Sequence, residues 1–135
     1  MPRKQKKITV PEISVIMPCL NEEKGIGVSI KKAKEAIKKY KLSAEIIVSD
    51  NGSTDNSIKI AKRLKARVVY QKKKGYGNAY LKGLSAARGK YIVMGDSDDT
   101  YDFRDIPKFV KPLRHGYNVV MGSRFKGKIL PGAMS

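Results

Sequence analysis

The sequence predicts an α/β fold in which a doubly wound, mainly parallel sheet carries helices on both faces. Two observations lead to this prediction. Short and nearly continuous apolar runs recur along the chain, as in strands that are buried on both faces. Segments with the apolar spacing of amphipathic helices separate the runs, an order that favours parallel strands joined by right-handed crossovers. The chain has 135 residues, enough for a single domain with its own core.

The strands are expected at the apolar runs. These runs lie at 13–17, 45–49, 67–71, 90–94 and 118–121. Each is short and contains β-branched residues, and polar or glycine-rich segments follow it, which is typical of strands. Because the connections between the first four runs have helical spacing, neighbouring runs along the chain are predicted to lie parallel rather than to form hairpins.

Three helices are expected between the first four strands. The apolar face of the first consists of Ile26, Ile30, Ala33, Ile37 and Tyr40. Thr54 or Asp55 is expected to cap the second helix. The apolar face of the second consists of Ile58, Ala61 and Leu64, and that of the third of Ala79, Gly83, Leu84 and Ala87. Gly89 is expected to end the third helix. A weaker helical stretch follows at 102–115, interrupted by two prolines.

Composition limits the partners and the compartment. The chain has 29 Lys and Arg against 12 Asp and Glu, a net charge of +17 and one Cys. A single Cys excludes an intrachain disulfide framework and a four-thiolate zinc site, and it fits a reducing, cytoplasmic compartment. The basic balance favours an anionic partner: nucleic acid, an anionic membrane surface or a phosphorylated substrate. Residues 1–11 are expected to form a flexible basic arm, and 12–135 the domain.

Every unusual local sequence follows one of the predicted strands. These segments lie at 18–22, 50–55, 95–99 and 122–124. In an open parallel sheet, ligands bind outside the carboxyl ends of the strands. The coincidence therefore predicts a small-molecule site at that edge of the sheet.

Acidic residues cluster after the fourth strand, although the chain is cationic. Five of the twelve acids fall between Asp96 and Asp105. Asp96 and Asp98, one residue apart where the chain turns, are suited to hold Mg²⁺ or Mn²⁺ together with phosphate oxygens. The alternative is that these aspartates only end the strand and cap the next helix.

Three other segments have a ligand-binding interpretation, and two of them also have a structural one. Asp50 at the strand tip is placed to accept hydrogen bonds from a base or a sugar, but 50–55 also reads as a well-capped turn in which Gly52 allows the bend. Gly75 and Gly77 open a helix near three lysines and are suited to a diphosphate. Arg124 is either a phosphate clamp or an ordinary surface residue.

Taken together, five ordered motifs resemble family 2 glycosyltransferases. They are PCLNEE at 18–23, DNGSTD at 50–55, KGYGNA at 74–79, GDSDDTYD at 95–102 and GSR at 122–124. Within that family they are most similar to the polyprenol-phosphate sugar transferases, the dolichol-phosphate mannosyltransferases and their glucosyl relatives. The resemblance covers roughly residues 12–135 and implies a GT-A fold. It also implies Mg²⁺ or Mn²⁺ and an inverting transfer of a hexose from UDP-glucose or GDP-mannose to a polyprenyl or dolichyl phosphate.

The resemblance also implies residue roles. The implied nucleotide-sugar-binding residues are Pro18, Asn21, Glu22, Asp50, Gly52, Gly75, Gly77 and Asp96. Asp96 and Asp98 would ligate the metal, and Asp98 and Arg124 would be catalytic residues, with Arg124 on the acceptor phosphate. The acceptor phosphate is already anionic, so the reaction needs no dedicated general base. A basic face is expected to hold the protein peripherally against the anionic cytoplasmic leaflet.

Other interpretations remain beside this one. Family members continue further, so the chain is expected to be short at its C-terminus. Either it is trimmed or naturally shortened, or a partner or a homo-oligomer supplies the missing acceptor half. A catalytically inactive nucleotide-sugar-binding fragment is the alternative. Nucleic-acid binding is not favoured, because no base-reading motif is evident and the acids at 96–105 would repel a phosphate backbone.

Overall fold

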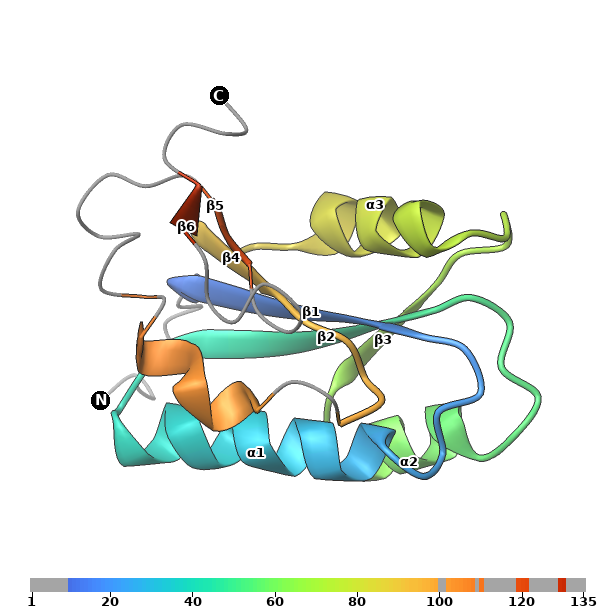
Figure 1. The fold of residues 1–135 in the computed structure, drawn as a ribbon, viewed down its shortest axis with the longest axis horizontal. Helices are drawn as coiled ribbons and strands as arrows, with labels where there is room; N and C mark the ends of the chain where they lie inside the picture. Colours follow the sequence, from blue (N-terminus) through green and yellow to red (C-terminus); the bar gives the residue numbers. More distant parts are fainter. Residues whose placement is uncertain (1–9, 100–101, 109, 111–118, 122–128, 131–135) are drawn as a thin grey trace, which may run out of the picture.

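Strands and helices alternate along the chain, and the strands form a single sheet (Figure 1). The computed structural model describes residues 10–99, 102–108, 110, 119–121 and 129–130. Within these residues the strands are β1 (Ile13–Cys19), β2 (Ala44–Asp50), β3 (Arg67–Tyr70), β4 (Tyr91–Met94), β5 (Val119–Met121) and β6 (Ile129–Leu130). All five predicted strands are present, and they differ from the prediction by at most two residues at either end.

The sheet is doubly wound. Its strand order is β3-β2-β1-β4-β5-β6; the pairs are parallel up to β5, and β6 is antiparallel to β5. β1 is the central strand, and its residues are all buried. The strand order reverses direction between β1 and β4, the place where such sheets bind ligands.

Helices cover both faces of the sheet, as predicted (Figure 1). On one face lie α1 (Ile26–Lys39), α2 (Ser57–Arg63) and the short turn η1 (Phe103–Asp105), whereas α3 (Tyr76–Ala86) lies on the other. Alternate side chains of β1 face opposite sides of the sheet. Ile13, Val15 and Met17 belong to the core beneath α1, whereas Ile16 contacts α3 at Gly83. The close approach of α3 depends on the missing side chain of that glycine.

Two details of the helix prediction are wrong. Tyr40 is 50% exposed, because it follows the last residue of α1 and has left the helical conformation, with φ −99° and ψ 9°. Gly89 does not end α3, which stops at Ala86. A Cβ on Gly89 would stand 2.6 Å from the amide nitrogen of Ser14, so this glycine allows the chain to pass close to β1.

The start of α2 also differs in detail from the prediction. The helix begins at Ser57 after Asn56, so neither predicted residue is in the capping position itself. Asp55 nevertheless satisfies the first turn, because its Oδ1 accepts from the backbone nitrogen of Ser57 at 2.9 Å and from its hydroxyl at 2.6 Å. Of the expected helical stretch at 102–115, residues 109 and 111–115 lie outside the described residues, as does the greater part of the expected basic arm at 1–11.

Candidate functional site

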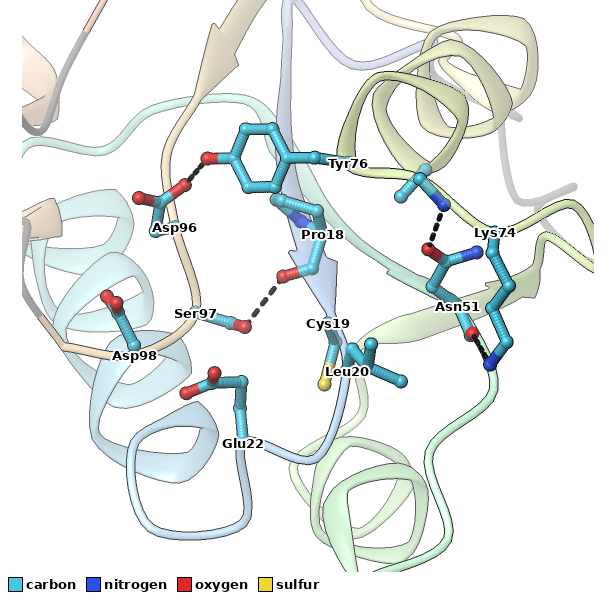
Figure 2. A pocket seen from close by; sticks show the side chains of 12 residues that line it. Pro18, Cys19, Leu20, Glu22, Asn51, Lys74, Tyr76, Asp96, Ser97 and Asp98 are labelled. Carbon is cyan, nitrogen blue, oxygen red and sulfur yellow. Dashed lines mark hydrogen bonds between the residues drawn. The ribbon is translucent and has the colours of Figure 1, made fainter.

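A cavity of about 290 Å³ opens at the carboxyl ends of β1, β2 and β4, beside the start of α3 (Figure 2). Segments far apart in the sequence meet there because the parallel strands end at the same edge of the sheet. Its lining residues are Pro18, Cys19, Leu20, Glu22, Asn51, Lys74, Gly75, Tyr76, Ala79, Asp96, Ser97 and Asp98. Acidic groups lie on one side and Lys74 lies on the other, so the cavity has opposite charges across it.

Three carboxylates form the acidic side: Glu22 from the loop after β1, and Asp96 and Asp98 from the loop after β4. The pKa of Glu22 is raised, first by burial and then by the negative charges of Asp98, Asp55 and Asp96. Burial, followed by the charge of Asp98, also raises the pKa of the neighbouring Tyr80 well above its usual range, so its hydroxyl stays protonated. The acidic side is therefore a region of strongly negative potential, which favours a cation.

The structure divides the five clustered aspartates into two groups. Asp99 pairs with Lys32 at 2.9 Å, and Asp105 pairs with Lys108 at 3.4 Å. Asp102 pairs with its neighbour Arg104 and caps the turn at 103–105. Asp96 and Asp98 line the cavity instead. Asp102 thus has a capping role, whereas the two residues predicted to bind metal line the cavity.

Close packing fixes the loop that carries these two aspartates. The Ser97 hydroxyl donates to the carbonyl oxygen of Pro18 at 2.6 Å, which ties the loop to the end of β1. On its other side the loop lies against Gly25, where an added Cβ would stand 2.7 Å from the carbonyl carbon and 2.8 Å from the Cα of Asp98. The position of Asp98 therefore depends on a glycine just before α1, which no motif in the sequence singles out.

Asn51 organises the opposite side of the cavity. Its Oδ1 accepts from the Gly75 nitrogen at 3.0 Å, and its Nδ2 donates to the carbonyl oxygens of Gln71 and Lys73 at 2.9 and 3.0 Å. The Lys74 ammonium donates to the Asn51 carbonyl oxygen at 2.8 Å. One buried amide thus holds the loop between β3 and α3 and places its lysine at the cavity.

Replacing Asn51 by aspartate is expected to destabilise the protein by about 1–3 kcal/mol, because two partly buried carbonyl oxygens lose their donor. The new carboxylate would also face these oxygens with negative charge. Urea unfolding followed by circular dichroism measures the change. Asn56→Asp is the matched control, since that side chain is exposed and makes no cap hydrogen bond. Equal stability of the two variants would contradict the role of Asn51.

The predicted site residues fall into three groups. Pro18, Glu22, Gly75, Asp96 and Asp98 come together around the cavity. Asn21, Asp50, Gly52 and Gly77 are not among its lining residues. Arg124 lies outside the described residues.

Of the four predicted residues that do not line the cavity, two make hydrogen bonds within the loops, one has a backbone conformation that favours glycine, and one lies in open space. Asn21 Oδ1 accepts from the Thr54 nitrogen at 2.7 Å, which links the first two loops. Asp50 is 2% exposed, and its Oδ2 accepts from the Gly52 nitrogen at 2.9 Å. Gly52 has a φ of +106°, a conformation that favours glycine. A Cβ on Gly77 would meet no atom within 4 Å.

Sequence reasoning left out several lining residues, among them Asn51, Lys74 and Tyr76. All three lie inside motifs quoted from the sequence, Asn51 in DNGSTD and Lys74 and Tyr76 in KGYGNA, so their positions carried a signal. The signal for Tyr76 is weak, because a tyrosine at the start of a helix is equally compatible with simple surface exposure. Its contact with the acidic side depends on how α3 packs against the sheet.

The acidic residues fit a divalent cation that is shared with a phosphorylated ligand. Among the described residues no three His, Cys, Asp or Glu side chains converge closely enough to hold a metal by themselves. Mg²⁺ typically binds one or two carboxylates and takes its other ligands from water and phosphate oxygens. Asp96 and Asp98 supply that number of carboxylates. Within the described part of the chain, no helix combines the length and apolarity needed to cross a membrane.

Two proteins whose names state an activity are similar in sequence to this chain. The chain is 46% identical over 125 residues to the low-salt glycan biosynthesis hexosyltransferase Agl6 of Haloferax volcanii, covering 92% of this chain and 30% of that protein. It is 36% identical over 116 residues to a dolichyl-phosphate hexose transferase of the same organism, covering 86% and 49%. The chain thus spans less than half the length of these two relatives.

Solved structures share the fold. Glucosyl-3-phosphoglycerate synthase from Mycobacterium tuberculosis, in complex with Mn²⁺, UDP and glucosyl-3-phosphoglycerate, matches with a TM-score of 0.66 and 31% identity, over 76% of this chain and 39% of that one. The same synthase with Mg²⁺ and UDP gives the same TM-score, identity and coverage. These matches agree with the predicted GT-A fold.

The family itself is shown by the match to the model described as glycosyl transferase family 2, which covers residues 14–134. Nearly the whole chain lies within this match, and the motifs quoted from the sequence lie inside it as well. The chain therefore belongs to glycosyl transferase family 2.

Proposed function

We propose that the cavity binds a nucleoside diphosphate sugar, UDP-glucose or GDP-mannose, together with Mg²⁺ or Mn²⁺. The observation that carries this proposal is the arrangement of charge: Asp96 and Asp98 lie on one side, and Lys74 and the first residues of α3 lie on the other. A diphosphate between a carboxylate-held cation and a lysine is stabilised from both sides. The mycobacterial synthase that shares the fold was solved with Mn²⁺ and UDP, which supports this ligand class.

The proposed reaction is transfer of the hexose to a polyprenyl or dolichyl phosphate with inversion at the sugar. An oxygen of the acceptor phosphate forms a bond to C1, while the bond from C1 to the donor diphosphate breaks and the nucleoside diphosphate leaves with the electron pair. The relative described as a dolichyl-phosphate hexose transferase supports this acceptor class.

Each residue has a defined part in the proposal. Asp96 and Asp98 would hold the metal, whose charge stabilises the leaving diphosphate when it is bound. Lys74 adds a positive charge at the cavity without any proton transfer. Glu22 and Pro18 bound the space for the nucleotide, and Arg124 would hold the acceptor phosphate. A phosphate oxygen is already ionised at neutral pH, so no side chain needs to remove a proton from it.

The basic surface supports a proposed peripheral contact with an anionic membrane at its cytoplasmic face, where the lipid acceptor would lie. The net charge is +17, and on α1 the residues Lys31, Lys34 and Lys38 are exposed. Each Lys or Arg near an anionic leaflet contributes about 1 kcal/mol to such a contact.

Isothermal titration of the purified chain with UDP-glucose and with GDP-mannose tests the proposal. We expect one of the two donors to bind in the presence of Mn²⁺, and binding to fall sharply when EDTA removes the metal. Transfer to a short-chain polyprenyl phosphate is measured in parallel. Binding without transfer would favour the nucleotide-sugar-binding alternative, and no binding of either donor with Mn²⁺ or Mg²⁺ would overturn the proposal.

A further inference from the structure

Two tyrosines of α3 direct their hydroxyl groups to the same oxygen of Asp96. Tyr76 donates to Asp96 Oδ1 (Figure 2), and Tyr80 donates to that oxygen at 3.3 Å. The two rings contact each other edge to face, with centroids 5.0 Å apart and an interplanar angle of 81°. Asp96 thus meets two hydroxyls from another element of the fold, and we call Tyr76 and Tyr80 the tyrosine pair.

The positions of the tyrosine pair follow from helix geometry and from the packing of α3. Residues four apart lie on the same side of a helix, so both rings point toward the loop after β4. Between them, Ala79 is 1% exposed, and one turn further Gly83 meets Ile16 of β1. These small residues seat α3 directly on the sheet, which fixes the backbone positions from which both rings extend.

The tyrosine pair differs in charge from the partners of the neighbouring aspartates. Asp99, Asp102 and Asp105 each pair with a lysine or an arginine, which offsets their charge. A tyrosine hydroxyl is neutral, and a hydrogen bond to an ionised carboxylate is stronger than one between two neutral groups. The two hydroxyls therefore orient the Asp96 carboxylate without adding positive charge to it.

We propose, building on the function proposed above, that Tyr76 is a positioning residue for the divalent cation, with Tyr80 as its support. Tyr76 fixes the Asp96 carboxylate across the cavity, so that the cation meets a preorganised acidic group. The tyrosines do not touch the transferred sugar in this proposal; they act through Asp96. Because the ring of Tyr76 also lines the cavity, replacing it by phenylalanine removes the hydroxyl and preserves the wall.

The test measures Mn²⁺ binding directly, without turnover. Free Mn²⁺ is quantified by electron paramagnetic resonance in the presence of UDP, for the full chain and for Tyr76→Phe, Tyr80→Phe and the double variant. A hydrogen bond to a charged group is worth about 1.5–3 kcal/mol, so we expect Tyr76→Phe to weaken Mn²⁺ binding by about tenfold or more. Tyr80→Phe should have a smaller effect, because 3.3 Å is long for a hydrogen bond between two oxygens.

Tyr40→Phe is the matched control, since that ring is exposed at the end of α1 and lies outside the cavity lining. The double variant tests coupling: its effect should be smaller than the product of the single effects, because both hydroxyls act on one oxygen. The melting temperature is recorded for each variant and should equal that of Tyr40→Phe. An unchanged melting temperature separates a positioning role from a merely structural one.

The outcomes distinguish this inference from the proposed function. If the unmodified chain binds Mn²⁺ with UDP and Tyr76→Phe binds it equally well or more tightly, the positioning role is overturned and the proposed function stands. If the unmodified chain binds no Mn²⁺ with UDP, the positioning role is overturned, and the donor titration described above decides whether the proposed function falls with it. Weaker Mn²⁺ binding with an unchanged melting temperature supports the role of Tyr76.

Discussion

Replacing Asp98 by alanine is expected to abolish the Mn²⁺-dependent part of nucleotide-sugar binding. Asp98 lies on the acidic side of the cavity, and its charge is the largest electrostatic contribution to the raised pKa of Glu22. Since changing a group that only supports a metal ligand costs 10–100-fold in affinity, losing a ligand itself should cost about 100-fold or more. Calorimetric titration of the donor at saturating Mn²⁺ measures the loss.

Asp105→Ala is the matched control for this variant. It removes a carboxylate from the same stretch of sequence, but one that pairs with Lys108 on the surface and does not line the cavity. We expect its donor affinity to equal that of the unmodified chain. An Asp98→Ala variant that still bound the donor as tightly with Mn²⁺ as before would show that the acidic loop is only a structural turn.

Replacing Gly25 by valine is expected to destabilise the fold and to displace Asp98. A Cβ at this position would stand under 3.0 Å from three backbone atoms of Ser97 and Asp98, and backbone atoms cannot rotate away as a flexible side chain can. Overpacking of this kind costs about 1–3 kcal/mol in the free energy of unfolding. Urea unfolding measures that cost, and the same preparation should bind the donor more weakly at saturating Mn²⁺.

The matched stability control is Gly77→Ala, another glycine close to the start of a helix. A Cβ at Gly77 meets nothing within 4 Å, and alanine favours helix over glycine by about 1 kcal/mol. We therefore expect this variant to be as stable as the unmodified chain or more stable. If Gly25→Val unfolded at the same urea concentration as the unmodified chain, the backbone contact with Asp98 would not constrain the loop.

The sequence predicted the sheet well because the relevant signal is local. A strand buried on both faces needs a continuous apolar run, and all five predicted strands are present near the expected positions. The errors concern contacts between distant segments. Gly89 looked like a helix stop, but its conformational role comes from its approach to Ser14, which lies 75 residues earlier. Nothing near Gly89 in the sequence signals that contact.

The candidate site shows the same difference between features with a local sequence signal and features that depend on the folded structure. Glu22, Asp96 and Asp98 were predicted because polar residues directly after parallel strands gather at one edge of a sheet. Asn21 was predicted on the same ground, yet its side chain links two loops instead of lining the cavity. The direction in which such a side chain points depends on its loop conformation, here a φ of +53°, which the motif does not determine.

No single continuous segment of the chain forms the wall of the cavity. Its lining comes from the ends of β1, β2 and β4 and from the first turns of α3, which the sheet and the hydrogen bonds of Ser97 and Asn51 hold together. A molecule bound there is therefore thermodynamically linked to the folding of all these segments at once, and it stabilises the native state in proportion to the logarithm of its concentration. The melting temperature of the entire domain thus becomes a reporter of which small molecules the cavity accepts.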